Sequence, residues 1–169
     1  MVIETNRLLI RDFISEDINA LYEILSDDET MVYVEPAYDF QKVQSFLNEF
    51  CIGCKGAVAA VHKDSKKMIG YILFKEIEKD IYELGWIFNK KHWKQGYAYE
   101  ACSKIMEHAF HKLGAQKIIA ETADKEKSLK LIKKLGMKQE SVQINSVKDT
   151  RGNLLDFYTF CLLKEDYKL

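Results

Sequence analysis

The apolar positions near the start of the chain have first the period of a strand and then that of a helix. Leu8 and Ile10 alternate with Leu9 and Arg11, which predicts a β-strand. Two helices are expected after it, because apolar residues then recur at spacings of three and four. The first helix carries Ile18, Leu21, Ile24 and Leu25, and the second, over residues 41–52, carries Val43, Phe46, Leu47 and Phe50.

The middle of the chain consists of short apolar runs separated by polar turns. The runs are GAVAAVHKD (56–64), KMIGYILFKEI (67–77) and IYELGWIFN (81–89). Runs of this length, rich in β-branched and aromatic residues, predict strands. Because the connections are short, the three strands should form an antiparallel meander.

The last part of the chain alternates between helices and strands. A helix ending at about Leu113 should place Ala98, Ala101, Cys102, Ile105, Ala109 and Leu113 in the core. KIIAETA predicts a strand, Asp124 can cap a short helix after it, and QESVQINSV and LLDFYTFCLL predict a final hairpin. This order of elements predicts an α/β (α+β) fold, with a mixed, mostly antiparallel sheet of about seven strands flanked by about four helices.

Composition limits the classes of protein to consider. The chain has 169 residues, which suits a single domain over residues 1–169, and its net charge of −1 gives no general attraction to nucleic acid or to an anionic membrane. No apolar run approaches the ~18–20 residues that span a bilayer, and the N-terminus lacks the apolar core of a signal peptide. We therefore expect a cytoplasmic protein without nucleic-acid or membrane partners. Its four cysteines fit ordinary thiols better than a metal site.

The loop before the long helix concentrates positive charge. Lys90, Lys91 and Lys94 precede Gly96 and Ala98, where a strand gives way to a helix. A helix N-terminus leaves backbone N–H groups unpaired and carries a partial positive charge, so anions bind there, and a glycine lets a ligand approach the backbone closely. The loop predicts a phosphate or pyrophosphate site, although a plain turn with solvated lysines would fit the same residues. Neither a three-glycine dinucleotide fingerprint nor a Walker loop is present.

Three segments together resemble the GNAT superfamily of N-acetyltransferases. ETNRLLIRDF resembles the opening strand of one branch, which has a Thr-x-Arg-Leu-x-Leu-Arg pattern. YELGWIFNKKHWKQGYAYEA is similar to the acyl-coenzyme A segment, and SLKLIKKLGM to an Asn-x-x-Ser … Lys-x-Gly-Phe helix. The branch includes ribosomal-protein N-terminal (alanine/serine) acetyltransferases and many small-molecule acetyltransferases. The three segments span almost the full chain.

The resemblance implies acetyl-coenzyme A as co-substrate and no metal. It implies that the strand edge at Trp86, Ile87 and Phe88 pairs with the pantetheine arm through backbone groups. It likewise implies that the N–H groups of the loop hold the pyrophosphate; the loop residues are Lys94, Gln95, Gly96, Tyr97 and Ala98. Trp93 stands where the superfamily commonly has Gln or Arg, as is frequent in this branch.

Glu83 is the candidate base for removing a proton from the acceptor amine. It lies on the strand that leads into the loop, among Tyr82, Leu84 and Trp86. Apolar surroundings suit a carboxylate for accepting protons near neutral pH, and several members of the family have a glutamate here. A glutamate that faces water or pairs with a lysine is an equally good interpretation.

Ser128 is the candidate donor to the leaving thiolate, but a purely structural role at the helix start fits as well. The chain departs from the family at two nearby positions: Lys125 replaces the usual Asn, and Ile132 replaces the Tyr that serves as acid in many members. These departures keep open a second hypothesis, a non-catalytic acyl-coenzyme A-binding or sensor module of the same fold.

The first hypothesis is an acetyl-CoA-dependent N-acetyltransferase that acts on a primary amine, either a peptide N-terminus or a small molecule, as a monomer or homodimer. The acceptor groove should lie between the first two helices and the last hairpin, around Tyr33, Glu35, Tyr38 and residues 145–155. Glu35, Asp39 and Asp149 are candidates for attracting a cation there, although ordinary surface acidity explains them too.

Overall fold

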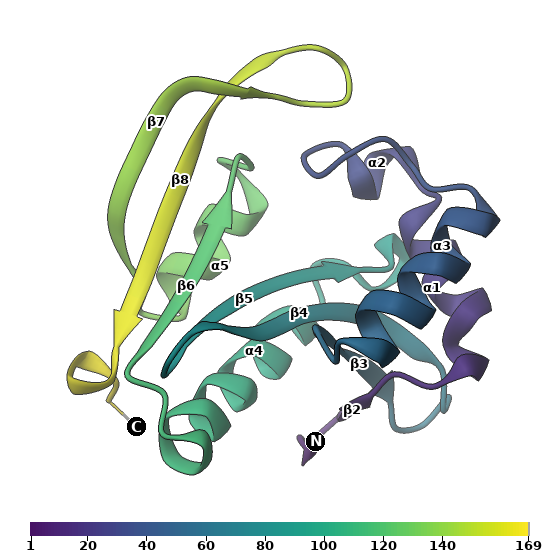
Figure 1. Ribbon diagram of the computed structural model, residues 1–169, viewed down its shortest axis with the longest axis horizontal. Helices are drawn as coiled ribbons and strands as arrows, with labels where there is room; N and C mark the ends of the chain where they lie inside the picture. The colour runs from purple at the N-terminus through teal and green to yellow at the C-terminus, as the bar shows by residue number, and fades with distance from the viewer. Residues whose placement is uncertain (169) are drawn as a thin grey trace.

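One eight-stranded sheet organises the protein, which is described over residues 1–168 by a computed structural model. The strand order is β1-β2-β3-β4-β5-β6-β8-β7, and every neighbouring pair is antiparallel except β5 and β6 (Figure 1). The strands are β1 (Val2–Glu4), β2 (Leu8–Asp12), β3 (Ala57–His62), β4 (Met68–Glu78), β5 (Ile81–Phe88), β6 (Lys117–Thr122), β7 (Lys138–Lys148) and β8 (Leu154–Leu163). The expected meander of β3, β4 and β5 is confirmed.

The sheet has one strand more than the sequence indicated. The additional strand, β1, pairs with β2 through only three residues, Val2 to Glu4. Such a short and largely exposed segment has no hydrophobic period to detect. The one-turn helix α2, at Asp28–Met31, went undetected for the same reason.

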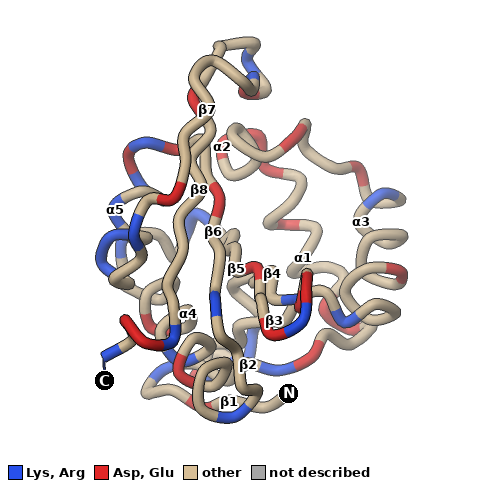
Figure 2. The backbone as a smooth tube through the Cα atoms, turned by 60° about the vertical axis from the view of Figure 1, so that its left-hand side comes forward, with Lys and Arg blue, Asp and Glu red and all other residues tan. Residues whose placement is uncertain are grey.

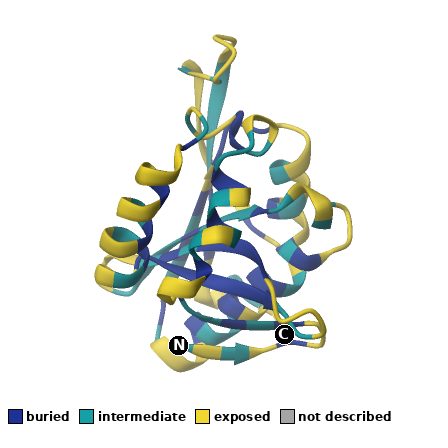
Figure 3. Ribbon diagram, turned by 90° about the vertical axis from the view of Figure 1, so that its right-hand side faces the viewer, coloured by how far each residue is buried: buried dark blue, intermediate teal, exposed yellow. Residues whose placement is uncertain are grey.

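Helices cover both faces of the sheet. α1 (Ile18–Leu25) and α3 (Phe40–Phe46) pack on one face, whereas α4 (Tyr97–His108) and α5 (Lys127–Lys134) pack on the other. Each face therefore has its own apolar cluster, and the buried side of each helix is turned toward the sheet (Figure 3). No helix in the described residues is long and apolar enough to cross a membrane.

The end of the long helix differs from the expected core stripe. α4 continues as a π-helix over Ala109–Leu113, which has more residues per turn than an α-helix. The wider turn rotates the last residues, so that Phe110 is 2% exposed and Leu113 is 41% exposed. The sequence prediction that Leu113 belongs to the core was therefore wrong, since it assumed an unbroken α-helical period.

The strands β5 and β6, the only parallel pair in the described sheet, separate near the centre of the fold. β5 and β6 pair through three residues each, Ile81 to Glu83 with Lys117 to Ile119. Beyond Glu83, β5 pairs only with β4, and beyond Ile119, β6 pairs only with β8. The two strands consequently diverge, as Figure 1 shows.

The last hairpin closes over the divergence. β7 is irregular between Gln143 and Val147, and the tip of the β7–β8 hairpin leans toward α2 (Figure 1). There the Thr150 N–H donates a 3.0 Å hydrogen bond to the Val32 carbonyl. This bond joins segments that lie on opposite sides of the opening.

Because of the π-helical turn, we expect substitutions of two apolar residues near the helix end to differ in their cost to stability. Phe110→Ala should lower the free energy of unfolding by about 3–5 kcal/mol, because it empties a filled core position. Leu113→Ala should change it by less than about 1 kcal/mol, because that side chain is already in contact with water. Urea unfolding of both variants measures the difference. A loss of stability for Leu113→Ala as large as that for Phe110→Ala would contradict the exposed position of Leu113.

Candidate active site

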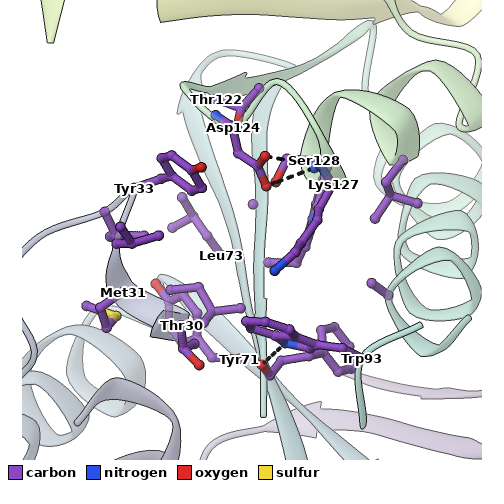
Figure 4. Close-up of a pocket in the computed structure, with 18 of the residues that line it drawn as sticks. Thr30, Met31, Tyr33, Tyr71, Leu73, Trp93, Thr122, Asp124, Lys127 and Ser128 are labelled. Atoms are coloured by element: carbon purple, nitrogen blue, oxygen red, sulfur yellow. Dashed lines mark hydrogen bonds between the residues drawn. The ribbon is translucent and has the colours of Figure 1, made fainter. Parts of the chain in front are cut away.

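A cavity of about 1250 Å³ lies where β5 and β6 diverge. Its walls come from β4, β5 and the α2–α3 segment on one side, and from β6, α5 and the start of α4 on the other. Figure 4 shows Tyr33 and Thr30 on one side of the cavity, facing Asp124, Ser128 and Lys127 on the other. All the residues expected to bind a co-substrate except Gln95 line this cavity, and so do Glu83 and Ser128.

The loop before α4 exposes a series of backbone donors to this cavity. Lys94 and Gly96 have left-handed backbones, with φ of 61° and 83°, and Gly96 is the N-cap of α4. Within residues 1–168 no hydrogen-bond acceptor engages the N–H groups of residues 94–98. Unpaired donors at the positive end of a twelve-residue helix attract an anion.

Glu100 and Arg7 fix this loop to the first part of the chain. The Glu100 carboxylate accepts hydrogen bonds from the Thr5 hydroxyl at 2.5 Å, from the Arg7 backbone at 2.8 Å and from Arg7 Nε at 2.7 Å. Arg7 Nη1 donates to the Gln95 carbonyl at 3.0 Å, and its guanidinium lies 4.1 Å from the centre of the Tyr97 ring. The segment ETNRLLIR thus acts as the support of the loop.

These contacts also set the ionisation of Glu100. Burial favours the neutral acid, but the hydrogen bonds from Thr5 and Arg7 outweigh it and lower the pKa of Glu100 from its ordinary value of 4.5. The carboxylate is therefore fully charged at neutral pH and holds the loop most firmly there.

Trp93 joins the loop to the end of β5. Its indole Nε1–H donates a 2.7 Å hydrogen bond to the Phe88 carbonyl. Across the cavity, the ammonium of Lys127 lies 3.8 Å from the centre of the Trp93 ring (Figure 4). The indole N–H of Trp93 therefore attaches the loop to the end of β5, at a position where the family commonly has Gln or Arg.

The cavity side of α5 is basic. Lys127, Lys130 and Lys134 recur at helical spacing and all line the cavity. Figure 2 shows the concentration of Lys and Arg along α5. Together with the N-terminus of α4, this row supplies positive charge to the α4–α5 side of the cavity, whose lining also includes Glu121, Asp124 and Glu126.

Glu83 lies on the opposite face of β5 from the α4 core. Its carboxylate is 3.3 Å from the Lys75 ammonium, and its side chain is 24% exposed. The structure thus contains the pairing with a lysine, and the role of Glu83 as a base stays a prediction. The carboxylate nevertheless lines the cavity and can be reached from it.

Ser128 has a structural partner as well. Its hydroxyl donates to Asp124 Oδ2 at 3.3 Å, and Asp124 also accepts the backbone N–H groups of Glu126, Lys127 and Ser128. The expected capping role of Asp124 is confirmed. Asp124 is 6% exposed, so this arrangement is a fixed part of the cavity wall.

The two family departures on and before α5 have separate structural settings. Lys125 forms a 2.7 Å ion pair with Asp156, which ties the start of α5 to β8. Ile132 is fully buried in the core and cannot donate a proton.

The expected acceptor residues divide into two groups. Tyr33, Glu35 and Tyr38 line the cavity. Asp39 instead caps α3 by accepting the Lys42 N–H, and Asp149 accepts N–H groups within the hairpin turn. Neither Asp39 nor Asp149 is among the residues that line the cavity, and their attraction for a cation stays a prediction.

Sequence reasoning assigned no role to several residues of this site. Glu100 lies 93 positions from Arg7, so no local pattern links them, although both belong to segments that carry the family resemblance. The contact of Lys127 with Trp93 and the position of Tyr71 in the cavity wall likewise depend on chain segments meeting in space.

Comparisons with known proteins agree on one family. A sequence model described as "Acetyltransferase (GNAT) domain" matches residues 7–138. The uncharacterized N-acetyltransferase YnaD of Bacillus subtilis (strain 168) is 33% identical over 172 residues, and the alignment covers 99% of each chain.

Solved structures agree with the sequence comparison. The acetyltransferase (GNAT family) from Bacillus anthracis has a TM-score of 0.89 at 26% identity and covers 98% of this chain and 99% of its own. Spermidine N-acetyltransferase from Vibrio cholerae, in complex with CoA and spermine, has a TM-score of 0.84 at 19% identity, covering 96% and 99%. Ribosomal-protein-S5-alanine acetyltransferase from Vibrio fischeri has a TM-score of 0.77 at 17% identity, covering 100% of both chains. The last two share the fold with this chain.

The lowered pKa of Glu100 predicts a pH-dependent contribution to stability. Because the folded-state pKa lies below 4.5, the contribution is complete above that value and is lost as pH falls through the folded-state pKa. Wild type should therefore exceed Glu100→Gln in free energy of unfolding by about 1–3 kcal/mol at pH 7. The difference should shrink steadily below about pH 4.5. Denaturant titrations of both proteins from pH 7 to pH 3 provide the measurement. A difference that stayed constant across this range would contradict the assignment.

Proposed function

The chain belongs to the GNAT family of acetyltransferases, and we propose that it moves an acetyl group from acetyl-coenzyme A to a primary amine by direct attack in a ternary complex. The observation that carries this proposal is the combination of two unsatisfied backbone surfaces in one cavity. One is the edge of β5 beyond Glu83, and the other is the set of N–H groups at residues 94–98. Family membership alone would leave the reaction of this chain open.

The cavity fits the parts of coenzyme A. An extended pantetheine arm carries amide groups that can pair with the β5 edge at Trp86, Ile87 and Phe88, as a strand does. The Phe88 carbonyl already accepts the Trp93 indole, so its remaining contribution is smaller than that of Trp86 and Ile87. The pyrophosphate would lie against Lys94, Gln95, Gly96, Tyr97 and Ala98, where free N–H groups and the helix dipole favour it.

The reaction moves one proton from nitrogen to sulfur. The lone pair of a neutral amine attacks the thioester carbonyl carbon, the carbon–sulfur bond breaks, and the products are an N-substituted acetamide and the free thiol. A backbone N–H of the strand carrying Ile87 would stabilise the oxyanion in between. Bringing both substrates together in one cavity supplies much of the rate.

Glu83 would accept the proton that leaves the amine, directly or through water. Its carboxylate lies beside Lys75, and its face of β5 is the one turned toward Tyr38 and Tyr71 rather than toward α4. An aliphatic ammonium with a pKa of ~10.4 must lose a proton before it can attack, which gives a base a definite task at neutral pH.

Ser128 would donate to the thiolate as the carbon–sulfur bond breaks. Its hydroxyl hydrogen now bonds to Asp124, so the donation requires rotation of that hydroxyl, and water in the cavity would then return a proton to the serine oxygen. The buried Ile132 leaves Ser128 as the hydroxyl that α5 provides within the cavity.

The co-substrate site is tested by adding a negative charge to the loop. Gly96→Asp should reduce coenzyme A affinity by at least about 100-fold, because the side chain repels phosphate and the backbone is left-handed there. Only Arg7 Nη2 comes near an added Cβ, at 3.5 Å, so the fold should persist. Calorimetric titration with coenzyme A measures the affinity. Gly152→Asp, at a left-handed glycine in the hairpin turn, is the matched control. Unchanged affinity in a folded Gly96→Asp protein would refute the phosphate site.

The proton-transfer role is tested by Glu83→Gln, which keeps the size of the side chain and removes the base. Turnover should fall by ~10²–10⁴-fold at pH 7 while coenzyme A affinity stays the same. The defect should diminish as pH approaches the pKa of the acceptor, since the amine then deprotonates unaided. A pH–rate profile of both proteins with one acceptor of known pKa measures this. Superimposable profiles would exclude Glu83 from proton transfer. Tight coenzyme A binding with no thiol release from any amine would instead support the sensor module.

A further inference from the structure

The cavity extends past Glu83 into a compartment with aromatic walls. Tyr38, Phe46, Phe50 and Tyr71 line it, and their rings contact one another. The ring centres are 5.8 Å apart for Tyr38 and Phe46, 5.2 Å for Phe46 and Phe50, and 5.6 Å for Phe46 and Tyr71. Leu25, Met31 and Leu73 complete the apolar lining. A surface of this kind binds an apolar group.

One polar atom in this compartment has no partner. Tyr71 is 7% exposed, and within residues 1–168 no group forms a hydrogen bond with its hydroxyl. Burial raises the pKa of Tyr71, so the hydroxyl stays protonated. Every side-chain nitrogen or oxygen without accessible surface does have a partner in the described residues, so the Tyr71 hydroxyl must be accessible. The Tyr71 hydroxyl is thus an available hydrogen-bonding group on the same face of the sheet as Glu83.

The carboxylates near this compartment are already neutralised by the chain. Glu83 pairs with Lys75 at 3.3 Å, and Glu35 pairs with Lys42 at 2.7 Å while also accepting the Tyr38 hydroxyl. Burial favours the neutral acid of Glu35, yet these hydrogen bonds lower its pKa, so the ion pair persists at neutral pH. Glu29 at the rim is exposed to water, which screens its charge. Glu121 and Glu126 of the cavity lining are exposed as well, so a second ammonium group on the acceptor would meet only ion-paired, hydrogen-bonded or water-screened carboxylates.

The roof of the compartment restricts the size of the acceptor. The Thr150 N–H bonds to the Val32 carbonyl, so the hairpin tip is attached to the segment that contains Tyr33. We infer that this contact hinders the approach of a folded protein to Glu83 more than that of a small molecule. A small molecule needs only the opening that remains beside it.

We propose that the acceptor is a small monoamine with an apolar body, an arylalkylamine or a branched alkylamine. Its body packs against Phe46, Phe50 and Leu73, and its nitrogen lies between the Glu83 carboxylate and the Tyr71 hydroxyl. One amine hydrogen points to Glu83 and the other to Tyr71, which leaves the lone pair free to attack the thioester. The inference rests on the proposed acetyl transfer and adds the class of acceptor to it.

The class is tested by rates with chosen acceptors at saturating acetyl-coenzyme A. Phenylethylamine and isoamylamine should have kcat/KM values at least about tenfold above those of spermidine and of an alanine-initiated peptide. Higher values for spermidine or the peptide would overturn the inference and leave the proposed acetyl transfer intact. Absence of turnover with all four would overturn the inference, and only absence of thiol release from every amine, in a protein that binds coenzyme A, would overturn the proposed acetyl transfer as well.

Variants test the placement of the amine. Tyr71→Phe removes only the hydroxyl and should lower kcat/KM for phenylethylamine about tenfold without changing coenzyme A affinity. Tyr22→Phe is the matched control, because Tyr22 packs on Phe40 outside the cavity lining and should leave kcat/KM unchanged. An unchanged rate for Tyr71→Phe would remove the hydroxyl from acceptor binding.

Wild-type protein provides a measurement that does not depend on the folding of a variant. With coenzyme A bound, phenylethylamine should raise Tm at concentrations where spermidine does not, because only a ligand of the folded state stabilises it. An equal or larger shift with spermidine would contradict the proposal.

Discussion

The early end of the pairing between β5 and β6 is the constraint on which the rest of this structure depends. Parallel strands normally continue side by side, but these two separate after three residues. Each is held in place by its other neighbour, β4 for β5 and β8 for β6, so neither edge collapses onto the other. The backbone groups that would have formed the ladder stay available at the centre of the molecule. An unpaired edge is costly in a closed interior, and here it borders a cavity that a ligand or water can fill.

The second unsatisfied surface is kept in shape by charge. The loop before α4 has two left-handed residues, and its N–H groups point to no acceptor in the described chain. Such a loop holds one conformation only if its surroundings fix it. Glu100 and Arg7 do so from the outside, and Trp93 does so from the end of β5. The cost of leaving donors unpaired is therefore offset by bonds formed elsewhere, and the donors remain free to bind an anion.

Different parts of the cavity are suited to the co-substrate of the family and to the acceptor of this protein. The groups proposed to hold coenzyme A, at the β5 edge and in the loop before α4, belong to the backbone, so this binding would not require particular side chains. The compartment that contains Phe46 and Tyr71 is aromatic, and the nearby carboxylates of Glu35 and Glu83 form ion pairs with lysines. Two proteins of this fold are named for different acceptors, spermidine in one and a ribosomal protein in the other. The fold therefore accommodates more than one kind of acceptor. Under the function proposed above, selection of the acceptor would depend on residues such as Phe46 and Tyr71.

The sequence alone determined the features that depend on residues close together in the chain. Alternating and helical spacings predicted seven of the strands and the main helices, since burial of one face imposes a period. The basic loop ending in Gly96 predicted an anion site, because a helix N-terminus and a glycine act through neighbouring atoms. The resemblance of three segments predicted the family, which the comparisons confirm.

Only the tertiary structure decided the features that join distant residues. The register of β5 against β6, the salt bridge of Arg7 with Glu100 and the meeting of Tyr71 with the α3 aromatics leave no periodic signal, since each depends on how separate segments pack. The exposure of Leu113 was decided in the same way, by a π-helical turn that the period of the helix did not reveal. For Glu83 and Ser128, the sequence supplied residue types suited to proton transfer, and the fold placed both in one cavity and gave each a local partner. Chemistry can be inferred from residue types, whereas the distances that make it possible are set by the fold.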